Sequence, residues 1–545
     1  MSAHRRGLTR RQFLKTTAAS AAAATAAAVG AGLAAPRTLT WPGVGTVLAQ
    51  AQKPPTLVQG VDPETLDPHF GESGIIGNVL GNVMESLIAY DRKMRPVPHL
   101  AESYEVLNDK VTWRFKLRQN IKFQNGKPFT AEAVKFTIDR TMNADLRRQG
   151  LNDPFPARSG VTQVKVVNAS TVDVVLARPN IILPVFMSFL YMMEPEYYGS
   201  KSPRETSVAP MGTGPWKVDE WIKGDRLALS AFDGYWRGAP QIKRVVFRPV
   251  PEKSQRMNML ITGEADIAIA LSPDDLPIVE RVSKLRVSIA PGSRRMHIGI
   301  PTDSPKYKDR RVRYALSHAI DWDTLSKGLL GRLTPERRAT VLVAGESWVS
   351  PRIKPLEFNR QRARSLLTEA GFPMNERIRV YTPVGRYLKD KETAEAVAGQ
   401  FREIGLQAEA APLDWTIYTD KMRSPGGMDD LYLLGLGSRF NGPEDLSIVT
   451  TGQIWDQTKW ITHTQNGPKF NAMYKELIET IDEKKQREMA FQMEQLFVEE
   501  TPWINLWIQP GATGVNRRLD WEDSGGGDRL NLWLPSERDV RFAPI

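Results

Sequence analysis

Strand-like and helix-like hydrophobic patterns follow one another along the chain, with no internal repeat. Alternating apolar residues predict a strand over 111–118, and two strands joined by a polar turn over 161–177. Apolar residues spaced by three and four predict helices over 310–331 and from about 472 to 500. At about 150 residues per domain, a chain of 545 residues predicts about three domains.

The N-terminal residues have the layout of an export signal. A basic stretch, "TRRQFLK" at 9–15, precedes an alanine-rich run over 18–35 and a small-x-small exit, "AQA", at 49–51. The paired arginines, followed by Phe-Leu-Lys, resemble the twin-arginine signal. Since alanine and glycine are only weakly apolar, we expect cleavage after Ala49 or Ala51 rather than a membrane anchor. Residues 1–51 are therefore predicted to be a signal peptide for export to the periplasm by the twin-arginine machinery.

The net charge of +11 would suggest a nucleic-acid partner, but it is concentrated at this N-terminus. The first 51 residues contain six Lys and Arg and no Asp or Glu. Without them, 67 basic and 62 acidic residues give a net charge of +5, spread without a basic run. So small and dispersed an excess argues against nucleic acid as the partner.

The chain lacks the local motifs of common catalytic and metal sites. It contains no cysteine, which excludes disulfides, thiolate metal sites and cysteine nucleophiles. No histidine begins a His-Glu-x-x-His motif, no Gly-x-Ser-x-Gly elbow occurs, and the Gly-Lys at 126–127 lacks the first glycine of a phosphate loop. The sequence therefore predicts no catalytic residue, metal site or cofactor. A secreted hydrolase with carboxylates brought together only by folding stays open as an alternative.

Several longer stretches occur in one order over most of the chain. They are "VPHLAESYEVLNDKVTWRFKLRQNIKFQNGKPFTAEAVKFTIDR", "GTGPWKV", "RMNMLITGEADIAI", "RRVRYALSHAIDWDTL", "FNRQRARSLLTEAGFP" and "MAFQMEQLFVEETPWINLW". Together they resemble the family 5 extracellular solute-binding proteins, the dipeptide, oligopeptide and nickel receptors of ABC importers. The resemblance implies an α/β fold, a two-lobed periplasmic-binding-protein-like clamp with an extra inserted domain, giving three domains with mixed sheets. It also implies a monomeric receptor, not an enzyme, that delivers its solute to an ABC permease and ATPase complex in the inner membrane.

The resemblance also divides the mature chain. Domain I is expected to be split over 52–89, 212–290 and 502–545. Domain II is expected to be inserted at 90–211, and domain III, the opposing lobe, to cover 291–501. The solute is then held between lobes that close about a hinge.

The stretch "GLGSRFNGPED" at 435–445 bears on the ligand. In peptide-binding members, an aspartate four residues before a proline pairs with the ammonium group of the peptide. The matching position before Pro443 is Arg439, and the arginine that holds the peptide carboxylate matches Arg386. Because two guanidinium groups attract anions and repel an ammonium group, the resemblance implies an anionic or polar ligand such as an opine, a sugar phosphate or a carboxylate.

Other residues are weaker candidates for the binding site. A small shift in the alignment would put Glu444 or Asp445 in the place of Arg439, which would favour a peptide or an amine. The segment "FGESG" aligns with a cleft-lining stretch of the family and contributes Glu72 and Ser73. Three tryptophans would form either flat apolar walls of the site or part of the core: Trp415, Trp455 and Trp460.

Overall fold

The structure is a computed structural model that describes residues 53–71, 74–91, 96–151, 153, 155–333, 335, 337–342, 349–424, 426–437, 445–446, 449–450, 460–523 and 540–543. The predicted signal peptide lies outside these residues. From Pro54 onward the chain forms one compact unit. Within the described part, no helix combines the length and the apolar character that crossing a membrane requires.

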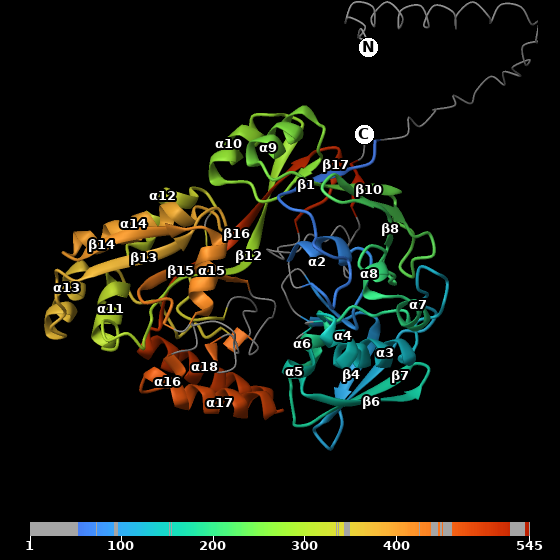
Figure 1. Ribbon diagram of the computed structural model, residues 1–545, viewed down its shortest axis with the longest axis horizontal. Coiled ribbons are helices and arrows are strands. Elements are labelled where there is room, and N and C mark those ends of the chain that lie inside the picture. The colour runs from blue at the N-terminus through green and yellow to red at the C-terminus, as the bar shows by residue number, and fades with distance from the viewer. Residues whose placement is uncertain are drawn as a thin grey trace, which may run out of the picture. The chain divides into compact units, whose positions relative to one another are not determined.

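A mixed sheet of ten described strands runs through this unit (Figure 1). Its order is β14 (Gln407–Leu413), β13 (Arg377–Pro383), β15 (Leu431–Gly437), β12 (Leu285–Gly299), β16 (Trp503–Asn516), β11 (Ile267–Ala268), β1 (Thr56–Gln59), β10 (Arg244–Pro249), β9 (Arg226–Ala231) and β8 (Trp216–Ile222). Strand β13 is parallel to β14 and β15, and β1 is parallel to β10 and β11. The remaining neighbours are antiparallel.

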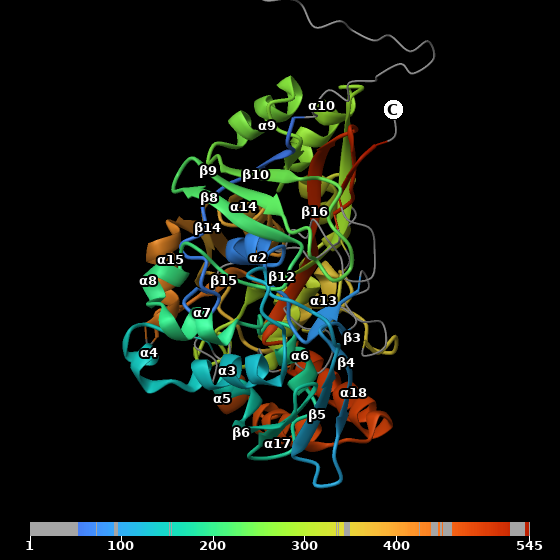
Figure 2. The same ribbon diagram turned by 90° about the vertical axis from the view of Figure 1, so that its right-hand side faces the viewer.

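The long strands β12 and β16 connect the two ends of this sheet, and they lie side by side in both views (Figures 1 and 2). Their pairing is interrupted between Ala290 and Arg294 by a register shift. At this point Gly292 lies so close to β16 that an added Cβ would stand 1.5 Å from the carbonyl oxygen of Gln509. Only glycine allows the two backbones to approach in this way.

A second sheet has four antiparallel strands in the order β4 (Ala101–Val106), β5 (Thr112–Leu117), β7 (Thr171–Leu176) and β6 (Val161–Asn168). The strands predicted over 111–118 and 161–177 are thus confirmed. One face packs on α3 (Ala131–Met142) around a core that includes Phe115, Val134 and Val174. The same part of the chain also forms short elements: β2 (Ile88–Tyr90), β3 (Pro96–Pro98), α4 (Ala144–Arg148), α5 (Phe155–Ser159), α6 (Leu183–Met187), α7 (Pro195–Ser200) and α8 (Pro203–Thr206).

Two predicted helices are each divided in the structure. The stretch 310–331 forms α11 (Arg310–His318) and α12 (Trp322–Leu330), because the side chain of Asp321 caps a new helix by accepting from the N–H of Thr324. The stretch near 472–500 belongs to α17 (Gly467–Glu479) and α18 (Glu483–Glu500), with Asp482 capping the second through the N–H of Lys485. In both cases the aspartate that caps the second helix sets the boundary between the two helices, although the spacing of apolar residues continues across it.

The other helices are α2 (Gly74–Leu80), α9 (Lys253–Thr262), η1 (Pro273–Asp275), α10 (Leu276–Glu280), α13 (Arg360–Glu369), α14 (Asp390–Glu403), α15 (Trp415–Arg423) and α16 (Trp460–His463), and a small sheet pairs β17 (Leu519–Asp520) with β18 (Arg541–Phe542). Helices and sheets both contribute to each main core. The predicted α/β class is thus confirmed. The boundaries of the three domains stay a prediction.

A buried carboxyl group lies in α18, which packs against α17. Glu494 of α18 is 1% exposed, and its oxygens accept hydrogen bonds from the hydroxyl of Thr340 and the N–H of Ser350. Burial raises the pKa of Glu494 to about 7. The folded protein therefore holds a proton on this group that the unfolded chain releases at a lower pH.

We expect this proton to make stability depend on pH. Because the pKa of Glu494 is raised on folding, its contribution is fully present below the ordinary glutamate pKa and is lost as the pH rises to about 7. Urea unfolding should show about 3 kcal/mol less stability at pH 7.5 than at pH 4.5 from this group alone. Glu494→Gln should flatten that part of the pH profile. A profile that keeps its slope in the variant would contradict the assignment.

Candidate functional site

Three neighbouring parallel strands end at one edge of the large sheet. They are β14, β13 and β15, and their carboxyl ends are Leu413, Pro383 and Gly437. In open α/β sheets, ligands bind outside the carboxyl ends of the strands, where the connecting loops meet. Two sequence-predicted residues, Arg386 and Trp415, follow directly after β13 and β14.

The loop after β13 is held in one conformation by a single carboxylate. Asp390, 4% exposed, accepts hydrogen bonds from the backbone N–H groups of Gly385, Arg386, Tyr387 and Lys391 at 2.8–3.1 Å. Gly385 has a φ of +73°, which glycine adopts without strain. The loop therefore presents the side chain of Arg386 from a fixed backbone.

The guanidinium group of Arg386 lies on aromatic rings. Its central carbon is 5.2 Å from the ring centre of Trp415 and 5.3 Å from that of Tyr387, and the two rings meet edge to face. Tyr387 is buried, Trp415 is half-buried and Arg386 is exposed. Stacking on rings holds a guanidinium group while leaving its N–H edges available to an anion.

A second arginine also lies near the Tyr387 ring. The guanidinium carbon of Arg294, on β12, is 5.6 Å from that ring centre, and Nη1 donates to the carbonyl oxygen of Gly435 at 3.0 Å. An added Cβ at Gly435 would lie 2.8 Å from Tyr387 and 2.7 Å from Met296, so glycine leaves room for this packing. We call Arg294, Arg386, Tyr387 and Trp415 the arginine–aromatic platform.

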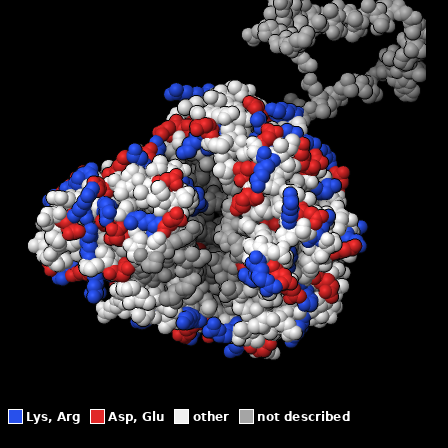
Figure 3. Space-filling view, in the orientation of Figure 1, with Lys and Arg blue, Asp and Glu red and all other residues white. Residues whose placement is uncertain are grey.

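The platform is positively charged and lies near strand β16. Among the described residues, the guanidinium group of Arg386 forms no ion pair with a carboxylate. The same loop contacts the long strand β16 through the N–H of Leu388, which donates to the side chain of Gln509 at 3.3 Å. Lys389 forms an ion pair of 2.6 Å with Asp274 of η1. The space-filling view shows the molecule hollowed between α15, which begins with Trp415, and α2 (Figure 3).

The other predicted site residues lie either outside the described residues or in the protein interior. Arg439, Glu444, Glu72, Ser73 and Trp455 lie outside the described residues. Asp445 is fully buried, with its carboxylate 3.5 Å from the guanidinium group of the buried Arg295. Trp460 lies in the core of α16–α18, where it packs edge to face on Phe470 and Phe497, and so does not line a site.

Sequence reasoning missed Arg294, Tyr387 and Asp390. Arg294 is distant in sequence from Arg386, and no local pattern connects the two. Asp390 had a detectable signal, because an aspartate at the start of a helix that follows a glycine-containing loop is typical of a side chain that bonds loop N–H groups.

Asp390→Asn should loosen the platform. An asparagine has one acceptor oxygen in place of two, so some of the loop N–H groups lose their partner, and we expect the free energy of unfolding to fall by about 1–3 kcal/mol. Urea unfolding measures this loss. Asp482→Asn, a change of the same kind at the exposed cap of α18, should cost less than about 1 kcal/mol. Equal losses in the two variants would contradict the role given to Asp390.

The described residues contain no group of three or more His, Cys, Asp or Glu side chains placed to hold a metal ion. The chemistry that the platform offers is therefore recognition: cationic N–H donors beside flat apolar rings. Such a surface suits a carboxylate or phosphate attached to an organic body.

Known proteins resemble the chain over nearly its whole length. It is 26% identical over 494 residues to a glutathione-binding protein of Escherichia coli K12, covering 88% of this chain and 94% of that protein. Among solved structures, NikA from Brucella suis in complex with Fe(III)-EDTA has a TM-score of 0.78 at 21% identity, covering 88% of this chain and 98% of NikA. AgaA of A. tumefacien R10, in complex with agropinic acid, has a TM-score of 0.71 at 19% identity, covering 90% and 99%.

The family profile of the bacterial extracellular solute-binding proteins, family 5, matches residues 95–454. Members of this family are transport receptors rather than enzymes, so the secreted hydrolase is not retained as an alternative. The profile covers more than half of the chain, and the alignment with the curated relative extends over 494 residues. The chain belongs to family 5 of the bacterial extracellular solute-binding proteins, the substrate-binding receptors of ABC importers.

Proposed function

We propose that this receptor captures a small organic anion, such as an opine, a sugar phosphate or a carboxylate, on the arginine–aromatic platform. The observation that carries the proposal is the exposed guanidinium group of Arg386, held on Tyr387 and Trp415 without a carboxylate partner among the described residues. An exposed arginine that its neighbours hold in place can donate paired hydrogen bonds to a carboxylate or a phosphate.

Two further features support an anionic ligand. Arg294 adds a second positive charge near the same Tyr387 ring, 5.6 Å from its centre. In the sequence Arg439 comes shortly after Gly437, the end of β15, which is the third strand whose carboxyl end meets the platform. In this proposal, Arg439 binds the ligand together with Arg386.

Some named ligands of similar proteins agree with this chemistry, whereas two other similar structures are named with peptides. Glutathione, agropinic acid and EDTA all carry carboxyl groups, and each is named for a protein that resembles this chain. The solute is then held between two lobes that close about β12 and β16, with the register shift near Gly292 as the bending point. The ligand makes some of its contacts only in the closed form, and it therefore binds the closed form more tightly than the open form.

Thermal unfolding of the purified mature protein tests the proposal. Opines, sugar phosphates, dicarboxylates, glutathione and free-amine dipeptides should be compared, because a ligand that binds only the native state raises Tm. At a concentration 100 times its Kd, a binding acid should add about 2.7 kcal/mol of stability. Stabilisation by free-amine dipeptides alone would reject the anionic ligand. That result would favour peptide or amine binding, with Glu444 as the carboxylate of the loop.

The remaining parts of the proposal concern cellular context. The receptor is exported folded by the twin-arginine pathway, acts as a monomer in the periplasm and delivers its ligand to a permease and ATPase complex. The "TRRQFLK" stretch supports the export route. Replacing Arg10 and Arg11 by lysine in the full chain should leave the protein in the cytoplasm, and unchanged export would show that another route is used.

A further inference from the structure

Two segments that are far apart in the sequence meet where α17 lies beside α5 in both views (Figures 1 and 2). The backbone N–H of Ile181, in the loop after β7, donates to the carbonyl oxygen of Ile478 in α17 at 2.9 Å. Arg178 and Glu479 form an ion pair of 3.9 Å between the same two segments. The first segment belongs to the predicted domain II and the second to the predicted domain III, so this contact joins the two proposed lobes.

The local structure prepares both sides of the contact. The carbonyl group of Ile478 is available because α17 ends one residue later, and the last four carbonyl groups of a helix lack partners within it. On the other side, the buried Asn180 fixes the loop: its amide nitrogen donates to the carbonyl oxygen of Ser159 at 3.1 Å, and its Oδ1 accepts from the N–H of Ile182 at 3.1 Å. The N–H of Ile181 is therefore presented from a fixed backbone.

The side chain of Ile478 connects two hydrophobic cores. It packs against the core of the four-stranded sheet, which includes Phe115 and Val174, and also against the core of α16–α18, which includes Leu477 and Phe497. Separating the two cores would expose this shared apolar surface to water. The contact therefore favours the form in which the two segments lie together.

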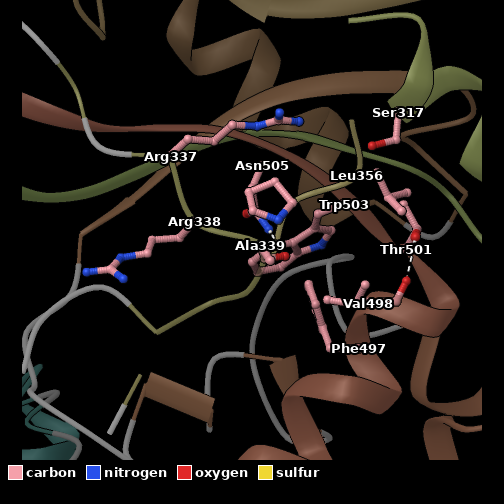
Figure 4. Close-up of a pocket in the computed structure, with 11 residues that line it drawn as sticks. Ser317, Arg337, Arg338, Ala339, Leu356, Phe497, Val498, Thr501, Trp503 and Asn505 are labelled. Carbon is pink, nitrogen blue, oxygen red and sulfur yellow. Dashed lines mark hydrogen bonds between the residues drawn. The ribbon is translucent and has the colours of Figure 1, made fainter. Parts of the chain in front are cut away.

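Helix α17 is connected by packing to β16, one of the two strands that run between the lobes. It packs on α18, and Phe497 of α18 meets the ring of Trp503, the first residue of β16, edge to face at 5.5 Å between centres (Figure 4). The pocket in this view has room for little more than one water molecule, so the helices fit closely on the strand. If β16 bends near Gly292, α17 and α18 therefore move together with its first half.

We propose that Ile181 and Ile478 form a clasp that holds the two lobes closed in part of the unliganded population. This inference rests on the hinge closure in the proposed function and adds a contact that governs it. A ligand on the platform then shifts an equilibrium that already contains the closed form, so its apparent affinity depends on the clasp. The pair of Arg178 and Glu479 contributes little, because both side chains are exposed to water.

Small-angle X-ray scattering of the purified mature protein without ligand tests the clasp. Ile478→Lys places a charge in the apolar contact, and it should raise the radius of gyration by about 1 Å above the about 23 Å of a compact chain of this length. The matched control is Ile481→Lys, a change at an isoleucine that is 40% exposed between α17 and α18, and it should leave the radius unchanged. Because no ligand is present, rejection of the anionic ligand would leave this result standing.

A second variant separates opening of the lobes from a loss of folding. Ile181→Asp should raise the radius of gyration as Ile478→Lys does. The protein that carries both changes has opposite charges facing each other, so it should regain about half or more of the lost compactness, which a folding defect would prevent. The proposal is overturned if Ile478→Lys keeps the wild-type radius, if Ile481→Lys raises it equally, or if the double variant is as expanded as the single ones.

Discussion

Arg386→Gln should lower the affinity for the acid that gives the largest thermal shift by at least about 30-fold, because it removes a charge and a pair of N–H donors from the platform. The fold should not change, since Arg386 is exposed and its guanidinium group forms no ion pair with a described residue. Isothermal titration measures the affinity, and the unliganded Tm should stay within about 1 °C of the wild type.

Two variants refine this result. Arg386→Lys keeps the charge but loses the planar pair of donors and the ring stacking, so its affinity should fall between that of the wild type and that of the glutamine variant. Arg377→Gln removes an exposed arginine at the opposite end of the same strand, where it pairs with Glu409, and should leave binding unchanged. An Arg386→Gln protein that binds every acid as the wild type does would exclude the platform as the ligand site.

Much of the fold could be predicted from local sequence periodicity. The pair of strands over 161–177 follows from alternating apolar residues around a polar turn, and both strands form as expected. The divided helices show the limit of this reasoning. Asp321 and Asp482 each cap a new helix within a continuous apolar pattern. The spacing of apolar residues alone gives no sign of such a polar cap.

The candidate site could be predicted only in part, for a physical reason. Arg386 and Trp415 were identified separately, by resemblance and by residue type, but their stacking depends on the parallel pairing of β13 and β14. Arg294 joins them from β12, which is neighbour to β15 in the sheet and far away in sequence. Contacts of this kind arise from sheet order, and a single sequence carries no local pattern for sheet order.

Asp67→Asn should lower the free energy of unfolding by about 3–5 kcal/mol, because it removes the negative charge that compensates a buried arginine. Asp67 is fully buried and pairs with Arg140 of α3, with Oδ2 at 2.6 Å from Nη2. Its oxygens also accept from the hydroxyl of Thr206 in α8 at 2.7 Å and from the backbone N–H of His69 at 3.1 Å. The carboxylate thus joins the segment that follows β1 to two helices from a distant part of the chain.

Urea unfolding of the Asp67→Asn protein, followed by tryptophan fluorescence, measures the loss. The matched control is Asp173→Asn, whose partner Arg114 is one-third exposed, so that water compensates the arginine and the cost should be about 1 kcal/mol. Arg140→Met in the Asp67→Asn background should recover part of the stability, since it removes the uncompensated charge. Such a recovery would show that the unpaired buried guanidinium group, rather than the lost hydrogen bonds alone, causes the instability. Equal losses in the Asp67 and Asp173 variants would instead show that burial does not govern the strength of these pairs.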